Sequence, residues 1–178
     1  FIQRDYNPPS IIVWVPLNES WGAREIYAVN QQQRLCNTLF QLCKAMDPTR
    51  LVIGNDGWEQ VYTDIVALHD YAAQGEALAA HFGDREQMEK GFADWRMTYA
   101  RDFEPEDGPY DEPVMITEYG GIAMTIKGQQ GRVDNMEAWG YNDKVDSEEA
   151  FLARFRSLTD AIRALPYCRG YCYTQLTD

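Results

Sequence analysis

Two glutamates, Glu19 and Glu118, each follow an apolar run and open a polar, glycine-bearing turn. The first run is residues 11–17, before Asn18-Glu19-Ser20-Trp21-Gly22. The second is residues 114–117, before Glu118-Tyr119-Gly120-Gly121. A β-branched run that ends on a carboxylate is typical of a buried strand that carries an acid to the mouth of a site. Two such strands could supply a pair of carboxylates, which is the minimum equipment for cleaving a glycosidic bond.

That chemistry asks different things of the two acids. One carboxyl must donate a proton to the leaving oxygen, and a less polar setting would keep it protonated. In a retaining reaction the other must stay ionised through hydrogen bonds and attack the anomeric carbon, with the two groups about 5–5.5 Å apart. The sequence must therefore place two strand ends close together and give each its own surroundings.

The pattern of apolar residues predicts strands that alternate with amphipathic helices. Strands are expected at about 11–18, 51–54, 64–71, 114–117 and 169–175. Helices are expected at about 24–46, which Asp47-Pro48 closes, at 87–101 and at 148–164. Residues 105–113 are expected to form a loop, and 120–146 a long glycine-bearing connection, which is functional or disordered in most compact domains. Such alternation indicates an α/β fold, with a parallel sheet covered by helices.

Polar side chains gather just after these strands, among them Asn18, Asp56, His69, Tyr71 and Gln175. Parallel α/β folds build their sites at the carboxyl ends of the strands. Agreement among five strands is a stronger signal than any single motif.

The composition of the chain limits the kinds of molecule that it is expected to bind. The chain has 178 residues, is 45% apolar and carries a formal net charge of -12. That charge disfavours nucleic acid and anionic membrane surfaces. No apolar stretch approaches the roughly 20 residues needed to span a bilayer, and no signal peptide is visible. Both ends resemble cuts, so a localisation signal of a parent protein could lie outside the chain.

The four cysteines are expected to be reduced thiols, which favours a cytoplasmic location, although the localisation stays unassigned. They are Cys36, Cys43, Cys168 and Cys172. Their spacing matches no metal site. Cys36 and Cys43 are seven residues apart and are expected to share the buried face of a helix. We expect no metal or cofactor, although Asp56 and Asp70 could be considered as ligands.

The motifs around both glutamates resemble a known family. Arg4-Asp5, Asn7-Pro8-Pro9-Ser10, Trp14 and Asn18-Glu19 resemble the acid/base signature of glycoside hydrolase family 2. Thr117-Glu118-Tyr119-Gly120-Gly121 is similar to its nucleophile signature, and residues 170–178 look like the eighth strand of many bacterial members. The family includes β-galactosidases, β-glucuronidases and β-mannosidases.

The resemblance implies a partial (β/α)8 barrel, with residues 1–178 as the C-terminal portion that carries strands four to eight. Strands one to three would lie upstream. It implies that Glu19 is the acid/base, Glu118 the nucleophile and Asn18 a ligand of the sugar 2-hydroxyl. Tyr71 matches the tyrosine that hydrogen-bonds the nucleophile, and no cofactor is implied.

Several positions keep two interpretations. His69 is either a substrate contact or a structural histidine, and Asp56 with Trp58 is either a substrate contact or a packed turn. Trp139 and Tyr141 are either a sugar-stacking wall or loop packing. Gln175 is expected to be structural. The usual tryptophan platform of the eighth strand is replaced by Thr174-Gln175.

Three functions from different classes remain open at this stage. The first is the catalytic half of a retaining β-glycoside hydrolase, which alone would lack full activity. The second is a carbohydrate-binding domain without turnover. The third is an assembly-forming fragment whose exposed barrel edges self-associate or pair with a missing N-terminal part.

Overall fold

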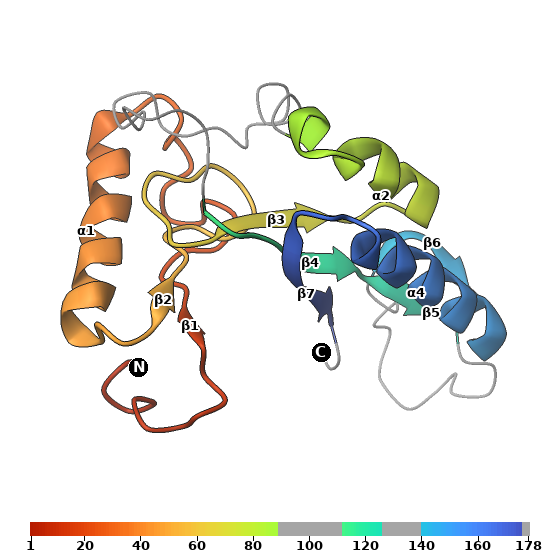
Figure 1. The fold of residues 1–178 in the computed structure, drawn as a ribbon, viewed down its shortest axis with the longest axis horizontal. Coiled ribbons are helices and arrows are strands. Elements are labelled where there is room, and N and C mark those ends of the chain that lie inside the picture. The colour runs from red at the N-terminus through yellow and green to blue at the C-terminus, as the bar shows by residue number, and fades with distance from the viewer. Residues whose placement is uncertain (89–111, 126–139, 176–178) are drawn as a thin grey trace. The chain divides into compact units, whose positions relative to one another are not determined.

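The computed structural model describes residues 1–88, 112–125 and 140–175, which form two compact units. The first unit is Phe1–His69 with Glu89–Met115, and the second is Asp70–Met88 with Ile116–Asp178. Figure 1 shows the elements of both units, which are described separately below.

The first unit contains a strand–helix–strand motif. Strand β1 (Val13–Trp14) pairs in parallel with β2 (Leu51–Val52), and α1 (Asn30–Met46) connects them. The expected strands at 11–18 and 51–54 are therefore too long. Pro16 has no backbone N–H with which to continue a ladder, and pairing resumes only as the isolated parallel bridge between Asn18 and Asp56.

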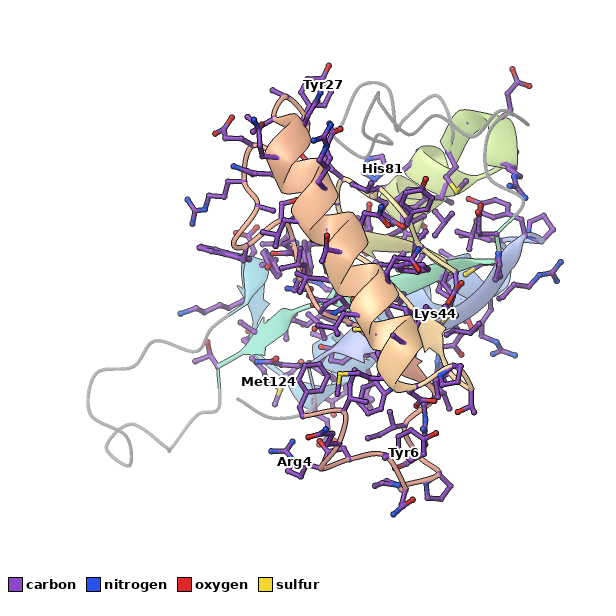
Figure 2. The ribbon with its side chains drawn as sticks, turned by 90° about the vertical axis from the view of Figure 1, so that its left-hand side faces the viewer. Arg4, Tyr6, Tyr27, Lys44, His81 and Met124 are labelled. Atoms are coloured by element: carbon purple, nitrogen blue, oxygen red, sulfur yellow. The ribbon has the colours of Figure 1, made fainter. Side chains whose placement is uncertain are left out.

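Helix α1 begins six residues later than the predicted start at residue 24. The preceding segment instead forms turns, in which the N–H groups of Ala28 and Val29 both donate to Glu25 O. Val29 is extended (φ -117°, ψ 104°), so the helix begins only after it. Figure 2 shows α1 running between the ends marked by Tyr27 and Lys44.

Side chains from α1 close the core of the first unit. Cys36 and Cys43 are both buried on its inner face, as predicted. Cys43 packs with Trp14 and Val52, and Cys36 packs with Ala23, Ile26 and Val61. A third cluster joins Ile53, Ile65 and Ala67 to Val13, Val15 and Met115.

A buried carboxylate, Asp47, ends α1. It is fully buried and accepts hydrogen bonds from the Trp14 indole (2.9 Å), the Thr49 hydroxyl (2.6 Å) and the Arg50 guanidinium (2.6 Å). Burial raises the pKa of Asp47, but the hydrogen bonds from Thr49, Trp14 and Arg50 outweigh it and hold the pKa below its usual range.

Strands β3 (Val66–Asp70), β4 (Val114–Gly120) and β7 (Cys168–Thr174) form a three-stranded sheet in the order β3-β4-β7. All of β3 is buried. The chain passes from the first unit to the second within β3 and again within β4. These strands confirm the sequence prediction to within a few residues at each end.

The second unit contains a helix that the sequence analysis missed, α2 (Gly75–Phe82). It packs on α4 (Glu148–Arg163), which matches the predicted helix and has Ser147 as its N-cap. The contact is close at Gly75, whose N–H donates to Ser157 Oγ (3.0 Å) and where a Cβ would lie 2.3 Å from Ser157 O. Glycine therefore has a packing role here, although it weakens the helix signal in the sequence.

The prediction of a long connection at 120–146 is wrong near both of its ends, where the structure has strands. Residues Ile122–Met124 form β5 and Tyr141–Val145 form β6, and the two strands pair in parallel. The predicted helix at 87–101 and loop at 105–113 lie almost entirely outside the described residues.

None of the four cysteines forms a disulfide. Among the described residues, no helix is both long and apolar enough to cross a membrane.

Candidate active site

Glu19 lies in a strained turn of the first unit. Its backbone N–H donates to Asp56 O (2.8 Å), and the Asp56 N–H donates to Leu17 O (2.9 Å), so this turn is tied to the loop after β2. Glu19 (φ 48°) and Ser20 (φ 57°) are both left-handed. Such a conformation costs a non-glycine residue on the order of 1–3 kcal/mol and persists only where surrounding contacts fix it.

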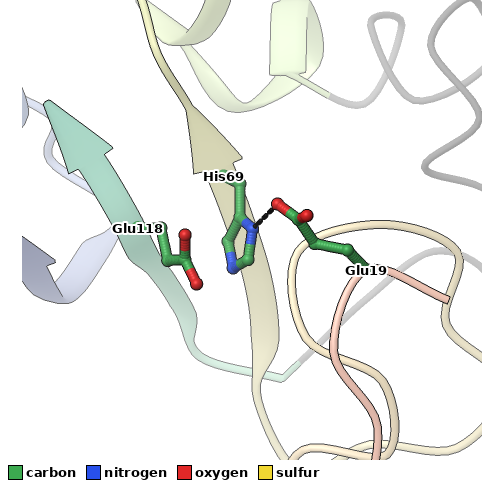
Figure 3. Close-up of side chains that lie close together, drawn as sticks. All are labelled: Glu19, His69 and Glu118. Atoms are coloured by element: carbon green, nitrogen blue, oxygen red, sulfur yellow. Dashed lines mark hydrogen bonds and ion pairs between the residues drawn. The ribbon is translucent and has the colours of Figure 1, made fainter. Parts of the chain in front are cut away.

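The Glu19 carboxylate contacts a buried histidine from the same unit. Glu19 Oε1 lies 2.8 Å from His69 Nδ1, as the dashed line in Figure 3 shows. The His69 side chain is fully buried, whereas that of Glu19 keeps 20% of its surface exposed. One oxygen of Glu19 is thus tied to an imidazole while the side chain remains accessible, an arrangement suited to moving a proton at that carboxyl.

The loop after β2 surrounds this histidine. Asp56 Oδ1 lies 3.4 Å from His69 Nε2, and the Trp58 ring meets the imidazole edge-on at 5.7 Å. Gly57 has φ 89°, and a Cβ there would lie 2.3 Å from His69 Nδ1. Asp56 and Trp58 therefore fix the histidine, which supports the packed-turn interpretation for these two residues and leaves their contact with substrate a prediction.

Glu118 lies on β4 in the second unit, opposite a tyrosine hydroxyl. Tyr71 donates a hydrogen bond to Glu118 Oε2 at 2.5 Å, the contact that the resemblance implied. The Tyr71 ring stacks on Tyr141 at 3.7 Å with 20° between the planes, and Asn142 Nδ2 donates to Tyr71 O (2.7 Å). A phenol donor stabilises an ionised carboxylate, which suits a nucleophile.

The two glycines after Glu118 leave room for aromatic rings. Gly120 has φ 98°, and a Cβ there would lie 2.3 Å from the Tyr173 ring; Gly121 has φ 57°, and a Cβ there would lie 2.4 Å from the Tyr141 ring. Burial raises the pKa of the Tyr173 phenol, so this ring stays neutral at physiological pH. Gly121 thus lets Tyr141 approach, and the Tyr141 ring stacks on Tyr71.

The structure sorts the predicted site residues between the two units. Within the first unit it gathers Glu19, Asp56, Trp58 and His69, with Asn18 exposed next to Glu19. Within the second it brings Tyr71 to Glu118. Trp139 lies outside the described residues. Tyr141 begins β6 and its ring stacks on Tyr71, and its contact with a sugar stays a prediction.

Sequence reasoning missed three buried polar residues of the first unit, Ser20, Asn55 and Glu59. They hydrogen-bond one another although 35 to 39 residues separate Ser20 from the other two. In the sequence they look like ordinary turn residues, and only the apolar residues around them hint at burial.

A parallel strand–helix–strand unit with carboxylates after its strands is the design of an α/β barrel enzyme domain. A family comparison agrees. A sequence model described as "Glycosyl hydrolases family 2, TIM barrel domain" matches residues 1–160. The chain belongs to glycoside hydrolase family 2, and its fold is part of a (β/α)8 barrel.

Solved structures show the same fold. A family 2 β-galacturonidase from Eisenbergiella tayi, bound to galacturonate, matches with a TM-score of 0.60 and 20% identity over 98% of this chain and 27% of its own. A β-glucuronidase from Faecalibacterium prausnitzii matches with a TM-score of 0.56 and 22% identity, over 98% of this chain and 26% of its own. A β-glucuronidase from Dictyoglomus thermophilum matches with a TM-score of 0.58 and 15% identity, again over 98% of this chain and 26% of its own. Comparison with curated proteins gave no match. The chain spans about a quarter of the length of these solved structures.

Proposed function

We propose that this chain is the catalytic part of a retaining β-glycoside hydrolase, with Glu19 as general acid/base and Glu118 as nucleophile. The observation that carries the proposal is the different partner of each carboxylate. Glu19 meets the His69 imidazole and Glu118 meets the Tyr71 phenol. Family membership supports the reaction class.

The reaction would proceed in two displacements. Glu118 attacks the anomeric carbon while Glu19 donates a proton to the departing oxygen, which leaves a covalent glycosyl ester on Glu118. Glu19, now ionised, then takes a proton from water, which attacks the same carbon and releases Glu118. The mechanism requires the two carboxyls to be about 5–5.5 Å apart.

The other site residues would act on the sugar or on these two acids. Asn18 would bind the 2-hydroxyl, a contact that strengthens in the transition state. Tyr71 would orient Glu118, and His69, held by Asp56 and Trp58, would orient Glu19 and border the sugar. Trp139 would contribute a stacking surface.

We also propose that residues 1–178 form the C-terminal portion of the barrel, strands four to eight. Alone, this portion would leave strand edges open, so it would self-associate or pair with an N-terminal part, and it would lack full activity. Sedimentation of the purified chain at several concentrations tests this, and a clean monomer with enzyme-like turnover would contradict it.

Azide rescue of two variants in the polypeptide that carries the complete barrel tests the two roles. 4-Nitrophenyl β-glucuronide, β-galacturonide, β-galactoside and β-mannoside first identify the sugar. With Glu118→Ala, azide should attack directly and give the α-glycosyl azide. With Glu19→Ala, it should intercept the glycosyl ester and give the β-glycosyl azide.

Exposed Glu149 provides a control, since Glu149→Ala should hydrolyse the substrate normally and give no azide product. The same product anomer from both site variants would contradict the assignment. Sugar binding by the wild type without any hydrolysis would favour a carbohydrate-binding domain instead.

A further inference from the structure

A buried polar cluster lies directly beneath the turn that carries Glu19. It consists of Ser20, Asn55 and Glu59, each at most 5% exposed, and is called the Ser20 cluster below. All three belong to the first unit. Buried polar groups are costly to leave unpaired, so a connected set of them marks a place where geometry is fixed.

The hydrogen bonds of the cluster grip Ser20 at two points. Asn55 Oδ1 accepts from the Ser20 N–H (2.9 Å), and Asn55 Nδ2 donates to Ser20 Oγ (3.0 Å). The Ser20 hydroxyl donates to Glu59 Oε2 (2.5 Å). Asn55 Nδ2 also donates to the Glu59 backbone carbonyl (2.5 Å), which closes the loop from 55 to 59.

These hydrogen bonds hold the part of the turn whose backbone is strained. Glu19 and Ser20 are consecutive non-glycine residues with positive φ, a conformation that relaxes unless its surroundings hold it. Relaxation of either residue would rotate the Glu19 side chain away from His69 Nδ1. The same loop supplies Asp56 O, which accepts from the Glu19 N–H. Residues 55 and 56 together therefore fix the backbone N–H groups of both Glu19 and Ser20.

We infer that the Ser20 cluster is a positioning device for the general acid/base: Asn55, Ser20 and Glu59 hold the strained turn so that the Glu19 carboxyl points at the leaving oxygen. The inference rests on the proposed function for the role of Glu19. None of the three residues touches the substrate in this scheme. Their effect is confined to steps in which Glu19 donates or accepts a proton, and kcat/KM reports only the step in which it donates.

The ratio of kcat/KM for two substrates can therefore separate a misplaced acid from a simple loss of folded enzyme. A phenyl glycoside needs protonation of its leaving oxygen, whereas 2,4-dinitrophenolate departs without a proton. A misplaced acid therefore lowers kcat/KM for the phenyl substrate and spares the dinitrophenyl substrate. Loss of folded enzyme lowers both by the same factor.

Two variants of the complete barrel polypeptide test the inference with the sugar it accepts. Ser20→Gly tolerates the positive φ but removes the hydroxyl, and Asn55→Asp keeps the acceptor and removes the amide donor. Each should lower kcat/KM for the phenyl glycoside on the order of 10- to 100-fold, as for a catalytic group displaced by about 1 Å. The dinitrophenyl value should stay near that of the wild type.

Gln33 provides a matched control. It is 2% exposed, lies in α1 of the same unit and donates through Nε2 to Ile26 O (2.9 Å). Gln33→Glu thus removes a buried amide donor, as Asn55→Asp does, but away from the turn. It should leave the ratio of the two substrates unchanged. Glu59→Gln, which keeps an acceptor for Ser20, should lose less phenyl activity than Glu59→Ala.

A second measurement does not depend on activity. The ¹⁵N chemical shift of His69 Nδ1 reports its contact with Glu19, and it should move in both cluster variants and not in Gln33→Glu. If the shift moves but the wild type hydrolyses no β-glycoside, the positioning of Glu19 holds and the proposed function fails. If the wild type is active, equal losses on both substrates, or an unmoved His69 signal, overturn the inference alone.

Discussion

Replacing Tyr71 with phenylalanine should slow release of the sugar from Glu118 far more than its capture. The substitution removes only the hydroxyl group that donates to Glu118 Oε2 at 2.5 Å. The ring should stay in place, because the stacking on Tyr141 and the hydrogen bond from Asn142 to Tyr71 O involve groups that phenylalanine keeps. Any kinetic effect therefore reports the lost donor.

The size and the step of the effect follow from the charge on Glu118. The carboxylate keeps most of its charge in an oxocarbenium-like transition state and loses it only in the glycosyl ester, so a donor speeds the breaking of the ester and leaves its formation nearly unchanged. A hydrogen bond to a charged group is worth about 1.5–3 kcal/mol. At about 1.36 kcal/mol for each factor of ten, deglycosylation should slow roughly 10- to 150-fold.

Stopped-flow release of 2,4-dinitrophenolate measures both steps in the complete barrel polypeptide. Tyr71→Phe should show a burst equal to the enzyme concentration, a lower kcat and little change in kcat/KM. Tyr167→Phe is the matched control, since it removes a phenol donor of the same length that bonds to Phe82 O in the same unit. A fall in kcat/KM without a burst would refute this reasoning.

Three further predictions concern stability, measured by urea unfolding. Gly57→Ala should lower the free energy of unfolding by roughly 2–4 kcal/mol, because φ is 89° and the new Cβ would lie 2.3 Å from His69 Nδ1; an unchanged midpoint would contradict the packing. Ser147→Ala should cost about 1 kcal/mol through the lost N-cap bond from Ala150 N (3.2 Å), and no loss would mean that the cap adds nothing. The depressed pKa of Asp47 stabilises the fold above its unfolded pKa of about 3.9, and this contribution is lost as the pH falls through the lower folded pKa. Asp47→Asn should therefore flatten the acid side of the stability profile, and a parallel profile would exclude Asp47 as its source.

The elements that sequence patterns predicted well are those whose signal is local. The apolar residues of α4 repeat at helical spacing after a serine cap, and α1 ends at Asp47-Pro48, so the whole of α4 and the end of α1 lie where expected. The predicted strands β3, β4 and β7 are confirmed because each is a run of strand-forming residues beside a turn. These signals need no knowledge of the rest of the fold.

The elements that were missed depend on distant partners. Helix α2 is short and begins at Gly75, a residue that is needed because the backbone packs closely against Ser157. Strand β5 has only three residues and becomes a strand by pairing with β6, 17 residues or more along the chain. The left-handed backbone at Glu19 is likewise invisible locally, because Asn55 and Glu59 hold it from 35 residues away or more.

One strand supplies the partners of both predicted catalytic acids. His69, near the end of β3, contacts Glu19, and Tyr71, just after the strand, contacts Glu118. Under the proposed mechanism, two residues that are two positions apart in the chain thus serve the proton donor and the nucleophile. A single insertion at Asp70 should disturb both azide-rescue reactions together, whereas changes in the Ser20 cluster should disturb only the one that depends on Glu19.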